Sequence, residues 1–291
     1  METHRSAALL KGQKRYNAAI SLLRTITRAH PSMAVVHYQL GLLLGLAGRT
    51  DEAVRAFRTA ARIEPDNPYI AIAEARLLLR NGRIEDARAR TVLAIALAEH
   101  HAGPALASAH EVAARVGLAL EDADEAETHA AAAETEEETG PIRGFVHGRI
   151  LFSEGRYEEA REALEAAVAA AGPDRQVPEE LHLSLAETLV RLERYPEAEE
   201  HFREEMRAFP CDIRAYAGLA TLLQALHRTE AAGEILDALV EATRTPEGYR
   251  TAARLWTLAG EPMRAAAVKA DARAWFRAEP APPRSAQGAR R

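Results

Sequence analysis

Residues 34–67, AVVHYQLGLLLGLAGRTDEAVRAFRTAARIEPDN, contain the pattern that decides the fold. Apolar residues recur at helical spacing on both sides of Gly48, and Pro65 follows the second run. Glycine accommodates the left-handed backbone that often ends a helix, and proline cannot continue a helix. The stretch therefore predicts two helices joined by a tight turn.

The same pattern extends over the whole chain. One alanine recurs at the start of each second helix, as Ala19, Ala53, Ala87, Ala126, Ala160, Ala198, Ala232 and Ala265. A small residue recurs in each first helix, as Ala7, Gly41, Ala75, Ala114, Gly148, Ala186, Ala220 and Ala253. Paired helices can approach to the usual 8–10 Å only where the side chains at their crossing are small. The recurrence predicts about eight antiparallel helix hairpins.

This unit resembles the tetratricopeptide repeat, a 34-residue helix–turn–helix motif. The residues that match its signature are Leu40, Gly41, Ala53, Phe57 and Pro65. His37 and Leu44 replace the Trp and Tyr of the signature. The resemblance implies an all-α, right-handed superhelical solenoid whose first helices line a concave groove and bind peptide segments of partner proteins. In such a stack each repeat is expected to contact only its neighbours.

The repeat frame predicts one solenoid domain over residues 1–279. Its repeats are expected at about 1–33, 34–67, 68–106, 107–140, 141–178, 179–212, 213–245 and 246–279. The segments HHAGPALAS and GPDRQVPEE lengthen two units and contain Gly and Pro, which indicates longer loops. Residues 280–291, PAPPRSAQGARR, are Pro-rich with a basic end and predict a disordered tail.

The groove is expected to carry a row of arginines among apolar side chains. The ninth positions of three consecutive repeats are Arg76, Arg115 and Arg149. The nearby groove-facing positions supply Tyr38, Tyr69, Ile72, Phe145 and Phe152. Because arginine binds a carboxylate through two charge-assisted hydrogen bonds, we expect an acidic, partly apolar peptide here. In the alternative interpretation, each of the three arginines lies flat on its own repeat and pairs with a carboxylate close by, such as Glu74 or Glu111.

Composition excludes several classes of protein. The 291 residues carry a formal net charge of −6, which argues against a nucleic-acid partner because such binding needs a basic face. The single cysteine, Cys211, excludes a disulfide framework and a thiolate zinc site. No apolar run approaches the roughly 18 residues of a membrane span, and no signal-peptide core opens the chain. A cytoplasmic location is therefore expected.

No catalytic or cofactor motif stands out in the sequence. It contains no GxSxG elbow, no phosphate-binding glycine loop and no HExxH zinc motif. His37, His110 and His182 occupy the position of the signature tryptophan, so we expect them to pack between helices rather than bind a metal. No cofactor, no metal and no catalysis are predicted.

An acidic stretch over residues 121–138 lacks Lys and Arg and maps to a second helix, on the convex face. It predicts a solvated surface, or else a docking site for a basic partner or a means of preventing self-association. The chain as a whole is interpreted as a non-catalytic protein-interaction scaffold, with a monomer favoured. The alternative is a regulatory or substrate-recruiting segment of an enzyme whose catalytic part lies elsewhere.

Overall fold

The computed structural model describes residues 16–100, 103–134, 140–172 and 177–278, which form α-helices and no strand. The first seven helices are α2 (Tyr16–Ala29), α3 (Ala34–Leu46), α4 (Thr50–Ile63), α5 (Pro68–Arg80), α6 (Ile84–Glu99), α7 (Pro104–Ala119) and α8 (Ala123–Ala133). The next four are α9 (Pro141–Ser153), α10 (Tyr157–Ala171), α11 (Leu181–Arg191) and α12 (Tyr195–Ala208). The last four are α13 (Ile213–Ala225), α14 (Thr229–Thr243), α15 (Pro246–Leu258) and α16 (Pro262–Ala278).

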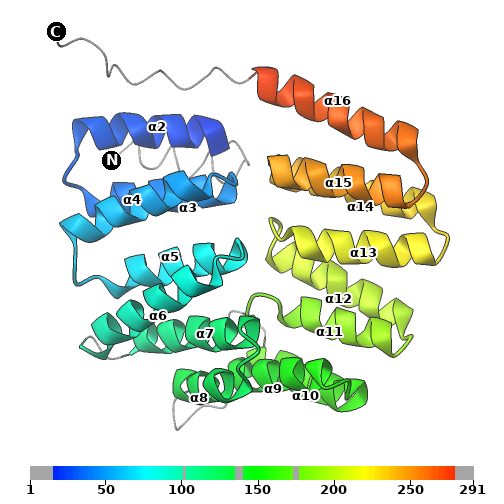
Figure 1. Cartoon of the computed structure of the whole chain (residues 1–291), viewed down its shortest axis with the longest axis horizontal. Coiled ribbons are helices and arrows are strands. Elements are labelled where there is room, and N and C mark those ends of the chain that lie inside the picture. Colours follow the sequence, from blue (N-terminus) through cyan, green and yellow to red (C-terminus); the bar gives the residue numbers. More distant parts are fainter. Residues whose placement is uncertain (1–15, 101–102, 135–139, 173–176, 279–291) are drawn as a thin grey trace.

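Consecutive helices from α3 onward pack in antiparallel pairs, α3 with α4 through to α15 with α16 (Figure 1). The predicted all-α solenoid of helix hairpins is confirmed. The weak helix expected before α2, with Ala7, lies outside the described residues, as does the predicted tail at 280–291.

The recurring small residues lie where the paired helices cross. All of them among the described residues are buried. A Cβ placed on Gly148 would lie 2.5 Å from Cγ of Leu164, and one on Gly41 would lie 2.7 Å from the ring of Phe57. Since carbon atoms do not approach so closely, a larger residue at either glycine would push the two helices apart. The reason inferred from the sequence for the small residues is therefore visible in the packing.

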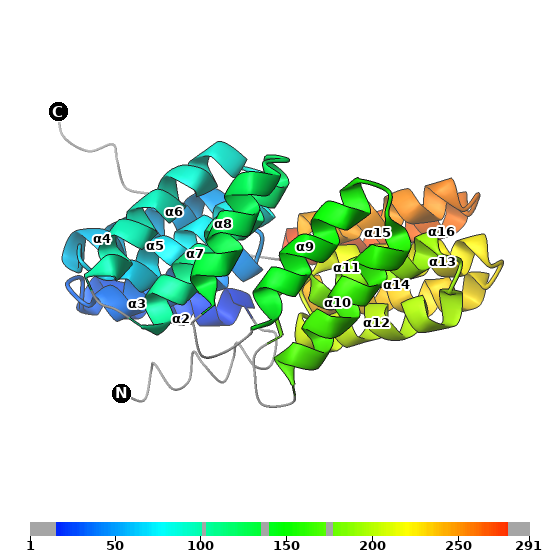
Figure 2. The same ribbon diagram turned by 90° about the horizontal axis from the view of Figure 1, so that it is seen from below.

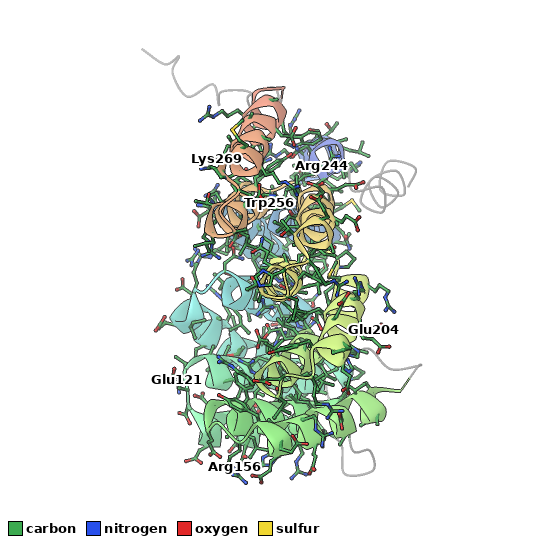
Figure 3. All side chains as sticks on the ribbon, turned by 90° about the vertical axis from the view of Figure 1, so that its right-hand side faces the viewer. Glu121, Arg156, Glu204, Arg244, Trp256 and Lys269 are labelled. Atoms are coloured by element: carbon green, nitrogen blue, oxygen red, sulfur yellow. The ribbon has the colours of Figure 1, made fainter. Side chains whose placement is uncertain are left out.

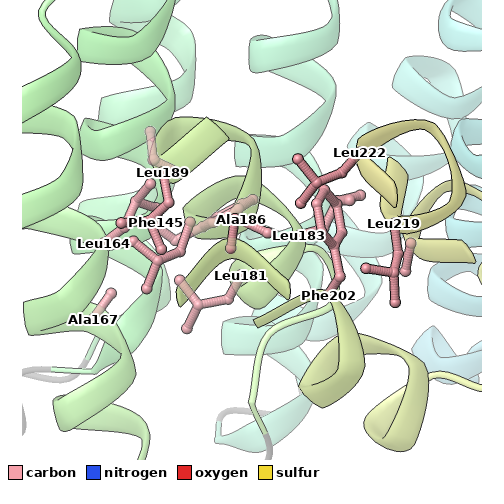
Figure 4. Packing of buried hydrophobic residues seen from close by; sticks show 14 of the residues in the cluster. Phe145, Leu164, Ala167, Leu181, Leu183, Ala186, Leu189, Phe202, Leu219 and Leu222 are labelled. Carbon is pink, nitrogen blue, oxygen red and sulfur yellow. The ribbon is translucent and has the colours of Figure 1, made fainter. Parts of the chain in front are cut away.

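The core runs through the stack from one repeat to the next. Phe145 of α9 and Leu164 of α10 pack against α11, and α11 packs in turn against Phe202 of α12 and Leu219 of α13 (Figure 4). These side chains are at most 2% exposed. Each hairpin thus buries its apolar faces against both neighbours.

The stack bends back on itself instead of remaining open. Helices α2–α8 form one arm, α11–α16 form the other, and α9 and α10 lie at the bend (Figures 1 and 2). The two arms touch: Tyr16 Oη lies 3.3 Å from Cys211 Sγ, and Gly48 lies against the side chain of Thr245. The expectation that each repeat contacts only its neighbours is therefore wrong for this chain, because the curvature of the stack brings distant repeats together.

The outer surface is charged. Glu121, Arg156 and Glu204 lie at the periphery of the molecule (Figure 3). The described part of the acidic stretch is helical over α8, and Glu134 at its end accepts a hydrogen bond from the Arg143 N–H at the start of α9. Residues 135–138 lie outside the described part.

Candidate peptide-binding groove

A cleft of about 360 Å³ lies between α3 and α5, with α7 at its edge. Four of the residues predicted for the groove line it together: Tyr38, Tyr69, Ile72 and Arg76. Tyr38 packs its ring against Phe57, with ring centroids 5.8 Å apart. Tyr69 is 49% exposed and offers the accessible apolar surface, whereas Ile72 lies at the base and is 3% exposed.

Two glycines of α3 help to form this cleft. Gly41 and Gly45 line it, and neither has a side chain to fill it. A Cβ on Gly45 would lie 2.9 Å from Cδ1 of Leu77 on α5. Gly45 therefore lets α5 approach α3 closely, and Gly41 makes room for Phe57 of α4.

Two arginines of α5 stand at the polar side of the cleft. Arg76 donates to Glu111 of α7 at 3.0 Å, and its side chain is 37% exposed. Arg80, one turn further along, pairs with Glu179 at 2.9 Å and is 41% exposed. Both guanidinium groups keep substantial solvent access, so each retains donors that could face a ligand.

A second cavity, of about 500 Å³, lies between the two arms. Arg76, Arg80 and Arg115 line it, together with Glu111 and Glu179. Arg115 is held there by two adjacent carboxylates: its Nη1 donates to Glu179 at 3.1 Å and its Nη2 to Glu180 at 2.5 Å. The Arg115 side chain is only 6% exposed.

The environment of these carboxylates favours their charged forms. Burial alone would raise the pKa of Glu180, but the charges of Arg115 and Arg214 outweigh burial and lower it to about 2. Burial of Glu179 is likewise outweighed by Arg80 and Arg115, so its pKa is lowered. Both groups are therefore anions at neutral pH, and the arginines are paired with full negative charges.

The other predicted groove residues lie apart from the cleft. Phe145 is 1% exposed and belongs to the core. Arg149 pairs with Glu187 at 3.0 Å, and its guanidinium lies 5.6 Å from the ring centroid of Phe152. Each arginine of the predicted row thus has a carboxylate partner, and that of Arg76 is Glu111, which the alternative interpretation named. The partners lie in other repeats, however, so the arginines do not pair within their own repeats.

Sequence reasoning missed four residues of this region: Arg80, Glu179, Glu180 and Arg214. Arg80 is the last residue of α5, four positions after the predicted groove residue Arg76, and Arg214 lies on α13 in the second arm. The two glutamates end the inserted segment GPDRQVPEE, whose Gly and Pro predict only a longer loop. The insertion itself was the available signal, because residues added to a repeat have to lie somewhere on the surface of the stack.

The histidines at the signature tryptophan position make polar contacts. His110 lies with its Nδ1 3.1 Å from Nδ1 of His129, and His182 repeats this with His201 at 3.0 Å. His37 contacts the carbonyl of Pro31. No group of three or more metal-ligating side chains occurs among the described residues. Over the same residues, no helix is both long and apolar enough to cross a membrane.

Comparison with known proteins gives a consistent result for the family and the fold. A sequence model of the tetratricopeptide repeat matches residues 6–68, 145–213 and 183–248, and a second one matches 46–111. No curated protein matches the chain in sequence.

Three solved structures illustrate the likeness in fold. A tetratricopeptide repeat protein from Parabacteroides merdae has a TM-score of 0.58 at 15% identity, covering 89% of this chain and 97% of that one. PilW, a type IV pilus biogenesis factor, has a TM-score of 0.55 at 16% identity, covering 76% of this chain and 96% of its own. PilF of Pseudomonas aeruginosa has a TM-score of 0.51 at 16% identity, covering 74% and 93%.

The repeat models cover more than half of the chain, and the helix hairpins fall where those models match. Together with the small residues buried at each crossing, this identifies the chain as a member of the tetratricopeptide repeat family.

Proposed function

We propose that this protein is an interaction scaffold that binds a partly apolar, acidic peptide in the cleft between α3 and α5. Tetratricopeptide repeat proteins in general serve as scaffolds for protein partners, and the fold makes that general role the starting point. The observation that carries the finer proposal is the convergence of Tyr38, Tyr69 and Ile72 with Arg76 in one cleft of about 360 Å³.

The cleft combines the two kinds of contact that such a peptide needs. Its exposed aromatic surface at Tyr69 would bury an apolar side chain, which gains about 25 cal/mol for each Å² removed from water. Arg76 and Arg80 lie on the two turns of α5 that follow Ile72, within reach of a carboxylate further along the same ligand. Their guanidinium groups are accessible, so the charge they offer is not lost to burial.

A synthetic peptide tests this directly. The probe is fluorescein-labelled FLGEEL, which places two apolar residues before a pair of glutamates, and its control is FLGQQL. Binding is followed by fluorescence anisotropy at low and moderate salt. We expect FLGEEL to bind more tightly than FLGQQL, and the difference to shrink as salt is added, because exposed charges are screened within about 8 Å at 0.15 M.

Two variants test whether FLGEEL binds in the cleft between α3 and α5. Tyr69→Ala and Arg80→Ala should each weaken FLGEEL binding by roughly tenfold, the effect of losing about 1.4 kcal/mol. The matched control is Arg55→Ala on α4, which removes an exposed arginine away from the cleft. Equal binding of the two peptides, or equal loss in Arg55→Ala and Arg80→Ala, contradicts the proposal.

A further inference from the structure

We propose that Glu179 and Glu180 are a built-in occupant of the groove, which an acidic partner displaces from Arg80 and Arg115. The inference rests on the proposed function and makes it more specific. It states that the partner presents two neighbouring carboxylates and that the protein's own acidic pair competes with them for the same arginines.

The two glutamates lie directly before α11, at the first two positions of the repeat 179–212. They end the insertion before α11 and reach across the groove, where Glu179 contacts Arg80 of α5 and Arg115 of α7 in the other arm. Glu180 contacts Arg115 and also Arg214 of α13. Three arginines from three different helices therefore converge on one acidic pair.

Glu179 and Glu180 do not satisfy every hydrogen-bond donor of Arg115. The two carboxylates bind the terminal nitrogens of Arg115 one each, and its buried Nε has no hydrogen-bond partner among the described residues. An arginine binds a carboxylate strongly through two parallel N–H···O bonds, and Nε together with one Nη can supply such a pair. A ligand carboxylate that approached side-on would satisfy the donor that the internal pair leaves free.

The backbone of the occupant also favours release. Glu180 has a φ of 75°, a left-handed conformation that is unfavourable for a residue other than glycine. It is held there partly because its N–H donates to Oε1 of Glu205 at 2.8 Å. Displacement of the acidic pair would relieve this strain, whereas the helices that carry the three arginines have no such strain to relieve.

The cavity beside the pair gives a partner room to compete. About 500 Å³ lies next to Arg76, Arg80, Arg115 and Glu179, and Arg76 and Arg80 line this cavity and the α3–α5 cleft alike. A peptide seated by its apolar residues in the cleft would therefore carry its acidic residues toward Arg80 first. Because Glu179 and Glu180 are part of the chain, they compete with a ligand for the arginines at an effective concentration on the order of millimolar. Weakly binding ligands are therefore excluded.

The test compares two single neutral substitutions on the same face of the array. Glu179→Gln removes one charge of the occupant, and Glu187→Gln removes a glutamate that pairs with Arg149 outside the cluster. We expect Glu179→Gln to bind FLGEEL roughly tenfold more tightly than the wild type. Glu187→Gln should bind it as the wild type does, and FLGQQL should not distinguish the three proteins.

Hydrogen exchange on the unmodified protein gives a second readout. The amides of Glu180 and Leu183 donate to Glu205, so displacement of the acidic pair should speed their exchange when FLGEEL is bound. FLGEEL binding of equal strength to wild type and Glu179→Gln, or slower exchange at residues 177–183 on binding, overturns the inference and leaves the proposed function standing. If FLGEEL binds none of the proteins better than FLGQQL, both proposals fail.

Discussion

The phenolic oxygen of Tyr16 lies 3.3 Å from the Sγ of Cys211, although 195 positions separate the two residues in the chain. Tyr16 begins α2, and Cys211 lies in the turn between α12 and α13. The contact joins the first described helix to the opposite arm of the solenoid, so it reports directly on whether the two arms are together.

Labelling of the only cysteine measures this closure. Replacing Tyr16 with Ala removes the group that covers the thiol, so we expect Cys211 to react with Ellman's reagent about tenfold faster, as for a lost contact worth roughly 1.4 kcal/mol. Tyr157→Ala, on α10 at the bend, is the matched control and should leave the rate unchanged. Equal rates in all three proteins would show that the arms do not close over Cys211.

The second prediction concerns the helix crossing at Gly148. Gly148→Ala should lower the free energy of unfolding by roughly 1–3 kcal/mol, because the new methyl group overlaps the fully buried Leu164. An alanine in an open helix position would instead stabilise by about 0.5–1 kcal/mol. Urea unfolding followed by circular dichroism decides the sign. If the overlap is the cause, Gly148→Ala should cost less in a Leu164→Ala background than in the wild type, as a double-mutant cycle would show.

Local packing could be predicted from the sequence, and contacts across the solenoid could not. Small residues equivalent to Ala53 and Gly41 recur because the two helices of every hairpin cross at the same place. The sequence of one repeat is therefore enough to predict this packing. The partner of Arg115 lies 65 positions away at Glu180. Whether Arg115 and Glu180 meet depends on the total rotation of the stack over several repeats. The sequence of a single repeat does not show how large that total rotation is.

Some residues of the candidate site could likewise be predicted from the repeat pattern, and others could not. Tyr38, Tyr69, Ile72 and Arg76 meet because adjacent first helices place equivalent positions side by side. Phe145 occupies an equivalent-looking position but is drawn into the core at the bend, where α9 packs against α10 and α11. Ile72 is also buried, at 3% exposed, but it lines the cleft, whereas Phe145 does not.

The third prediction follows from the burial of Glu205. This residue of α12 is fully buried and accepts hydrogen bonds from the N–H groups of Glu180 and Leu183 at the start of α11. Burial, with the nearby charge of Asp212 in support, raises its pKa to about 7, against the pull of those two backbone donors. The native state therefore binds a proton between pH 4.5 and 7 that the unfolded state does not bind.

The sign of the pH effect is set by this difference. The contribution of Glu205 to stability is complete below about pH 4.5 and is lost as the pH rises through about 7. Glu205→Gln should remove this dependence, so the difference in unfolding free energy between variant and wild type should change across pH 4.5–7. A constant difference over that range, measured by urea unfolding, would falsify the assignment.

The fourth prediction concerns the pair His182–His201, whose Nδ1 atoms lie 3.0 Å apart. Burial lowers the pKa of both rings, and the charge of His201 adds to the effect on His182. Stabilisation by the neutral histidine pair is complete above pH 6.5. It declines as the pH falls through the lowered pKa values of His182 and His201 in the folded protein. His201→Gln, which cannot be protonated, should lose less stability than the wild type between pH 7 and pH 5. Glu205 has the opposite slope, so the comparison is best made in the Glu205→Gln background.

The last prediction concerns the buried charge cluster that joins the arms. Arg115→Met leaves Glu179 with Arg80 alone and Glu180 with Arg214 alone. Breaking a buried ion pair costs about 3–5 kcal/mol when the remaining charge has no partner, so we expect a smaller loss here, of about 1–3 kcal/mol. Adding Glu179→Gln and Glu180→Gln to Arg115→Met should recover much of that loss, since the carboxylates that need a partner are then gone. Arg149→Met, which breaks the half-exposed pair with Glu187, is the matched control and should cost no more than about 1 kcal/mol. If the triple variant is as unstable as Arg115→Met alone, the cost comes from lost packing of the arginine stem and not from unpaired charge.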